Sequence, residues 1–135
     1  MPAATRSVVA LLCVLALATG CSSVGPHSDS AGSTAKRFHE ALVGSEPAAA
    51  CELLAPGTLT ELEQHADTSC PQALADAGLP NAAIVTSTDV YGTNARVVLD
   101  GDTVFLARFG AHWKVTAAGC EPRPGLPYDC DVKGS

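Results

Sequence analysis

Basic residues are few in this sequence of 135 residues, which contains 8 Lys and Arg against 14 Asp and Glu. One of the eight, Arg6, belongs to an apolar leader, so the chain after the leader has 7 basic and 14 acidic residues and a net charge of −7. Nucleic acids and anionic lipid surfaces attract proteins mainly through basic side chains. We therefore expect no nucleic-acid partner and no purely electrostatic adhesion to a membrane.

The signature motifs of several large enzyme classes are also missing. The sequence has no G-x-S-x-G, P-loop, H-E-x-x-H or G-x-G-x-x-G. It has neither C-x-x-C nor paired histidines at metal-ligand spacing, so we expect no metal and no cofactor. Asp100-Gly-Asp102 lacks the other ligands of a calcium loop and is interpreted as a hairpin turn. His39 and Glu40, as neighbours in a helix, would point about 100° apart, which argues against an acid–base pair.

No apolar run is long enough to cross a bilayer, which needs about 20 such residues. The run at residues 8–18 follows Arg6 and leads to Ala18-Thr19-Gly20-Cys21. This pattern is typical of an export signal that ends in a lipobox. We predict that residues 1–20 are removed and that Cys21 is diacylated, which would anchor the chain to the outer face of the cell membrane. The alternative is an ordinary secretory signal that leaves Cys21 as a free thiol.

Four cysteines remain after Cys13 and Cys21 are set aside. An even number in an exported domain indicates disulfides, and four cysteines allow three connectivities. We favour the two pairs that close short loops, which are Cys51–Cys70 and Cys120–Cys130.

Composition and periodicity divide the rest of the chain. Residues 21–33 contain the lipidated cysteine followed by a Gly/Ser-rich stretch, which predicts a flexible tether. Residues 34–135 are interpreted as one domain. Helical spacing predicts a helix from Ser33 or Thr34 to Gly44, and further helices near residues 45–54, 58–65 and 71–77. Alternating β-branched residues predict strands at 83–91, 95–100, 103–109 and 112–118. Residues 119–135 contain three prolines and are expected to form an irregular tail.

These elements predict an α+β fold, in which N-terminal helices pack on one face of a four-stranded antiparallel meander. Two-residue turns set the pairs Leu99–Val104, Val97–Leu106, Leu106–Val115 and Arg108–Trp113. One sheet face is then apolar and is expected to lie under the helices; it carries Ile84, Val90, Val97, Leu99, Val104, Leu106, Trp113 and Val115. The opposite face is mixed and carries Asp89, Tyr91, Arg96, Val98, Phe105, His112 and Lys114.

Arg96 and Lys114 are two of the few cations in an acidic chain. In the predicted register they flank Ala107 on the mixed face, with Phe105 and Tyr91 as apolar neighbours. An acidic domain repels anions except where its cations converge. We therefore predict that, if the domain binds through its sheet, these four residues make the contact, with an anionic ligand or the carboxylate of a partner protein. In the alternative interpretation the face is only solvated, with Asp89 and Asp100 as counter-charges.

Several segments carry a resemblance to a known family: KRFHEAL, ACELLAPGT, CPQAL, DGDTVFLARFGAHWKVTAAGC and PRPGLPYDC. They resemble small lipoproteins of high-GC Gram-positive bacteria (actinobacteria) over residues 36–132. The order of helices before an antiparallel sheet also resembles the helix-plus-cone fold of the nuclear-transport-factor-2-like (NTF2-like) and SnoaL-like superfamily. That superfamily includes ketosteroid isomerases and polyketide cyclases.

Two functions follow as expectations. The first is a non-catalytic, membrane-anchored extracytoplasmic lipoprotein that binds a small ligand or an envelope protein. The second is an NTF2-like enzyme, an isomerase or hydrolase acting on a small apolar substrate. We favour the first.

Overall fold

Four helices precede five strands in the computed structural model, which describes residues 26–134. The helices are α1 (Pro26–Val43), α2 (Pro47–Glu52), α3 (Pro56–Ala66) and α4 (Cys70–Asp76). The strands are β1 (Val85–Tyr91), β2 (Asn94–Leu99), β3 (Thr103–Phe109), β4 (His112–Arg123) and β5 (Leu126–Lys133). The strands form one antiparallel sheet in the order β1-β2-β3-β4-β5. The predicted leader, Cys21 and the first residues of the tether lie outside the described residues.

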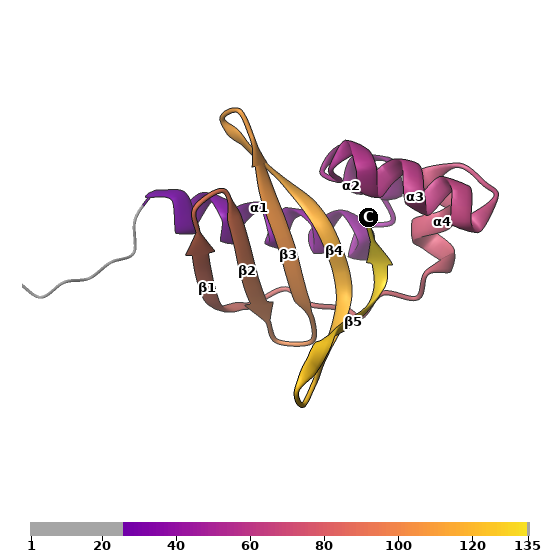
Figure 1. Ribbon diagram of the computed structural model, residues 1–135. Helices are drawn as coiled ribbons and strands as arrows, with labels where there is room; N and C mark the ends of the chain where they lie inside the picture. Colours follow the sequence, from indigo (N-terminus) through magenta and orange to yellow (C-terminus); the bar gives the residue numbers. More distant parts are fainter. Residues whose placement is uncertain (1–25, 135) are drawn as a thin grey trace, which may run out of the picture.

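Helix α1 runs behind the sheet and crosses its strands, while α2, α3 and α4 gather beyond β4 (Figure 1). The core lies between α1 and the sheet face that it covers. Ala31, Ala35 and Phe38 of α1 have no exposed surface. The sheet supplies the other side of this core through residues that are at most 4% exposed: Ala95, Val97, Leu99, Val104, Leu106, Trp113 and Val115. The predicted α+β class, helix order and apolar face at residues 97–115 are confirmed.

Helix α1 begins at Pro26, so the prediction that residues 26–33 form a flexible tether is wrong. Proline is well suited to the first turn of a helix, where its missing N–H has no intrahelical partner. Ala31 is completely buried, and the Trp113 indole N–H donates to the Ser30 hydroxyl at 3.0 Å. The small residues of segment 26–33 resemble a flexible linker in composition, but they pack α1 against the sheet.

The predicted irregular tail is also wrong, because β4 extends to Arg123 and pairs with β5. The prolines are tolerated for local reasons. Pro122 lies at a register shift in β4, and Pro127 lies in the edge strand β5 at a position without a paired residue in β4, where proline is tolerated. Cys120 and Cys130 are directly opposite each other in this hairpin, with their Cα atoms 4.0 Å apart.

Both predicted disulfides are present. Cys51–Cys70 connects α2 to the first residue of α4, and Cys120–Cys130 connects β4 to β5. The first bridge ties together helices that are each too short to be stable alone.

The predicted register is correct between β3 and β4 but wrong between β2 and β3. Leu106 faces Val115 as expected, whereas Val97 faces Val104 and not Leu106. The Leu99 N–H donates to the Asp102 carbonyl at 2.8 Å, so the two turn residues are Asp100 and Gly101. This shifts the pairing by two residues, which leaves every side chain on its predicted face.

Ile84 was expected on the covered face and is instead 63% exposed. A register irregularity between Val85 and Ser87 explains the difference, because one extra residue reverses the alternation of side chains before it. Val85 packs against the core in its place.

Candidate functional site

The structure places the four predicted binding residues on the same sheet but does not direct them to a common point. Arg96 lies opposite Phe105, and Lys114 lies opposite Ala107, whose other neighbour is Asn94. The prediction that Arg96 and Lys114 flank Ala107 is therefore wrong, because it depended on the shifted β2–β3 register.

Each of the two cations has a separate partner. Arg96 Nη2 lies 2.7 Å from Asp89 Oδ2, and this hydrogen bond raises the pKa of the Arg96 guanidinium. Lys114 Nζ donates to the Glu52 main-chain carbonyl at 2.6 Å. Asp89 thus serves as the counter-charge that the alternative interpretation named. Both charged side chains of the Arg96–Asp89 pair are more than one-third exposed, so the pair contributes little to stability.

The aromatic members of the predicted site also differ in their surroundings. The Phe105 ring packs edge-to-face against Tyr128, with 5.0 Å between centroids. Tyr91 is 61% exposed, at the end of β1. Binding by this mixed face stays a prediction.

Asp100, the other proposed counter-charge, has a structural role at the β2–β3 turn. Its Oδ1 accepts the backbone N–H groups of Ala83 and Ile84 at 3.0 and 3.1 Å. These bonds, first of all the one from Ile84, lower the pKa of the Asp100 carboxyl from its ordinary value. The carboxylate holds the segment that enters β1 against the turn.

This depressed pKa predicts a pH-dependent contribution to folding. The carboxylate stabilises the fold at pH values above its unfolded pKa, and that contribution is lost as the pH falls through the lower folded pKa. We expect Asp100→Asn to lower the melting temperature at pH 7, and the difference from the wild type to shrink as the pH falls below about 4. Melting curves between pH 7 and pH 2 test this, with exposed Glu61→Gln as the control. A difference that stays constant over this range would contradict it.

A buried ion-pair geometry that the sequence reasoning missed joins α1 to the sheet. His39 Nε2 lies 2.8 Å from Asp102 Oδ2, and the two side chains are 0% and 1% exposed. The same carboxylate accepts the N–H groups of Gly119 and Cys120, each at 3.0 Å. The sequence held one signal that His39 is buried. His39 lies four residues after Ala35, so the two side chains share the core face of α1.

The His39–Asp102 pair resembles the arrangement that orients a catalytic imidazole, but its surroundings are those of a structural pair. The Asp102 carboxylate already accepts three hydrogen bonds from protein groups. Neither residue lines any of the three surface cavities described below. The buried His39 Nδ1 has no hydrogen-bond partner within residues 26–134.

We expect Asp102→Asn to destabilise the fold by about 3–5 kcal/mol, since it leaves buried partner groups uncompensated. An amide cannot replace the carboxylate, because its NH₂ group would face one of the backbone N–H donors. Urea unfolding followed by circular dichroism measures the change. Asp100→Asn, two residues away and exposed, is the matched control and should cost less. Equal midpoints for Asp102→Asn and the wild type would overturn this account.

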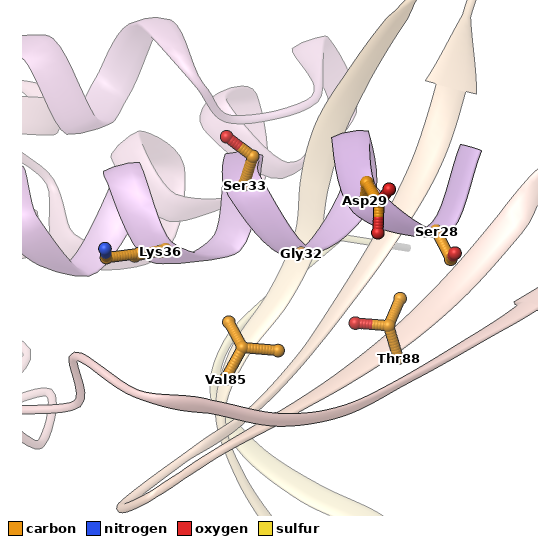
Figure 2. A pocket seen from close by; sticks show the side chains of 7 residues that line it. All are labelled: Ser28, Asp29, Gly32, Ser33, Lys36, Val85 and Thr88. Carbon is orange, nitrogen blue, oxygen red and sulfur yellow. The ribbon is translucent and has the colours of Figure 1, made fainter. Parts of the chain in front are cut away.

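The largest of the three cavities is a cleft between α1 and β1, with a volume of about 410 Å³. We call it the α1–β1 cleft. Figure 2 shows Val85 and Thr88 of β1 pointing toward the helix that forms the other wall. An added Cβ at Gly32 would lie 3.1 Å from Thr88 Oγ1. Glycine at this position therefore sets how closely the helix approaches the strand. The remaining lining residues are Ser28, Asp29, Ser33 and Lys36.

The α1–β1 cleft lies beside an unpaired sheet edge. Among residues 26–134, β1 has only one strand neighbour, which is β2, and Figure 1 shows β1 at the border of the sheet. An edge strand has one row of backbone N–H and C=O groups that no other strand uses. The cleft and the edge together form a groove with a polar helix on one side.

The other two cavities differ in chemistry. One, of about 370 Å³, lies between the end of α1 and α4, and includes apolar walls from Leu42, Leu74 and Leu79. The other, of about 240 Å³, lies between α1 and the start of β4 and is lined by Arg37, His112 and Lys114 among others.

Two further observations concern residues 26–134 only. No group of three or more His, Cys, Asp or Glu side chains in this part of the chain is arranged to hold a metal ion. None of its helices is long and apolar enough to cross a membrane.

In comparisons with known proteins, no family model, curated protein or solved structure matches the chain.

Proposed function

We propose that the chain is a lipoprotein held at the outer face of the cell membrane through Cys21, and that residues 26–134 are a non-catalytic binding domain. Its partner is an extended segment of another envelope protein, which binds in the α1–β1 cleft. The proposed export agrees with the two disulfides, since such bonds persist in oxidising compartments. We also propose kinship with the actinobacterial lipoproteins and the NTF2-like superfamily, on the segments quoted above.

The observation that carries the binding proposal is the open edge of β1 beside the cleft. An extended peptide can add to such an edge as a further strand, and main-chain hydrogen bonds then supply much of its affinity. Alternate side chains of the peptide would enter the cleft, where Val85 offers an apolar contact and Thr88 a hydroxyl.

Charges on α1 indicate which peptide would fit. Asp29 and Lys36 both line the cleft and are seven positions apart on the helix, which corresponds to about 10 Å along its axis. An extended chain covers this length in about three residues. Because only alternate side chains of an extended chain enter the cleft, the preferred segment carries one basic and one acidic residue two or four positions apart.

The enzyme alternative has one observation in its favour, the buried His39–Asp102 pair. An NTF2-like isomerase or hydrolase would need such a group to face an apolar substrate. Here the carboxylate is occupied by three protein donors, and the described cavities are lined by neither residue. We therefore favour the binding domain.

The anchor is tested at Cys21. Cys21→Ala should abolish incorporation of labelled palmitate and leave a precursor that retains residues 1–20, because the modified residue is the one that directs cleavage. Intact-mass analysis of the membrane fraction measures both effects. A native protein whose Cys21 carries an unmodified thiol would contradict the proposal.

The cleft is tested by reversing its charges without changing the net charge. A photo-crosslinking residue at exposed Ser87 of β1 should capture a protein in intact cells. Asp29→Lys with Lys36→Glu should reduce this adduct at least tenfold, because both charge contacts become repulsive. Glu61→Lys with Lys133→Glu is the matched control and should leave it unchanged. The same adduct from a crosslinker at Thr60 of α3, or full retention by the cleft variant, would contradict peptide binding at β1.

A further inference from the structure

The cavity between α1 and the start of β4 differs from the rest of this acidic chain in its charge. Arg37, His112 and Lys114 line it, and no carboxylate side chain does. The whole sequence has a net charge of −6. By contrast, the α1–β1 cleft pairs an acid with a base, and the Leu42–Leu74 cavity has no charged lining residue. We call this third cavity the Arg37–Lys114 niche.

Hydrogen-bond donors in the niche are only partly used. Within residues 26–134, the Arg37 side chain makes no hydrogen bond or ion pair. Lys114 Nζ gives one hydrogen to the Glu52 carbonyl, and an ammonium group has two more. Arg37 from α1 and Lys114 from β4 therefore line one space and together retain donors that no protein group in the described residues uses.

The walls of the niche are fixed by bonds that do not use these donors. The Trp113 indole N–H donates to Ser30 Oγ at 3.0 Å, and Thr34 Oγ1 donates to the Ser30 carbonyl at 3.0 Å. The first contact holds α1 against β4, and the second lies within α1. The Ser33 hydroxyl also lines the space. Most of the residues that line the niche thus lie on α1 and β4, while Leu53 directly follows α2 and Ala111 lies in the turn between β3 and β4.

We propose that the Arg37–Lys114 niche binds a phosphate group. A guanidinium can bind phosphate through two parallel N–H donors, and an ammonium acts as a point charge beside it. Donors that approach from two elements, with His112 and Ser33 at the sides, suit a tetrahedral anion better than a planar carboxylate. The volume of about 240 Å³ accommodates the group with part of its substituent.

Two sources can supply this chemistry. One is the headgroup of an anionic phospholipid, because Pro26 lies five positions after Cys21 and five residue steps can span at most about 18 Å. The other is a soluble phosphate ester outside the cell. Only the lipid source rests on the proposed anchor, while phosphate binding by the niche stands independently of it and of the α1–β1 cleft.

Trp113 is the one tryptophan of the chain and lines the niche, so its fluorescence reports occupancy. The full chain in neutral detergent is titrated with inorganic phosphate, with glycerol phosphate, and with micelles containing phosphatidylglycerol or phosphatidylcholine. Calorimetry is run in parallel. We expect saturable binding of the anionic phosphates. Arg37→Gln with Lys114→Gln should weaken it at least tenfold, while Lys114→Arg should retain it.

The matched control removes two cations elsewhere. Lys36→Gln with Lys133→Gln has the same net charge as the niche variant and should bind as the wild type does. Binding of the soluble phosphates supports the niche with a soluble ligand, and binding of phosphatidylglycerol micelles alone supports it with a lipid headgroup. Absence of heat and of a fluorescence change with every anionic phosphate would overturn the proposal, as would equal losses in both double variants. If the double variant unfolds, Arg37→Gln alone replaces it in the test. Arg37 is exposed on α1, so this single change should leave the fold intact and still weaken phosphate binding.

The cleft variant separates this proposal from the preceding one. Asp29→Lys with Lys36→Glu should leave phosphate binding unchanged, and the niche variant should leave the Ser87 adduct unchanged. Failure of phosphate binding would therefore not bear on peptide binding at β1.

Discussion

The carboxylate of Asp102 is the contact on which the arrangement of the other elements depends. It accepts one bond from His39 of α1 and two from consecutive backbone N–H groups of β4. The first of these N–H groups belongs to Gly119. Its φ is +64°, a backbone conformation that glycine adopts at little cost. An added Cβ there would also lie 2.7 Å from Leu79 Cδ2. The residue directly after the β2–β3 turn thus fixes the helix over the sheet, and both proposed sites have α1 as one wall.

Periodicity was sufficient to predict the parts of the fold that depend on local pattern. The alternation of apolar and polar residues around Val97, Leu106 and Val115 identified the buried face. This works because successive side chains of a strand point to opposite faces of the sheet. Composition was a poorer guide. The serines and glycine of residues 28–33 form part of a packed helix, and a proline-rich tail forms a hairpin. In both places long-range packing and strand pairing outweighed local preference, and neither can be seen in a short window of sequence.

The predicted binding face illustrates a different limit. The sequence correctly placed Arg96 and Lys114 on one side of the sheet, but a two-residue register error changed their neighbours. On the other side of β2, which this error does not affect, Asp89 of β1 lies directly opposite Arg96, so the charge is compensated across that strand pair. The Arg37–Lys114 niche was not predicted because it forms where α1 crosses β4. The residue spacing within α1 or within β4 does not indicate that the two cross. The crossing can be seen only when the position of α1 on the sheet is known.

Helix α1 links the two proposed sites through its own geometry. Lys36 and Arg37 are consecutive, so their side chains leave the helix about 100° apart; one lines the α1–β1 cleft and the other lines the niche. Ser33 lines both, which locates them on adjacent flanks of the same helical turns. The third flank, through Ala31, Ala35 and Phe38, is buried against the sheet. Because Asp102 holds His39 of this helix, the rotation of α1 about its axis is fixed. A change at the buried pair that rotates α1 would therefore alter the cleft and the niche together, whereas a change within one flank alters only one of them.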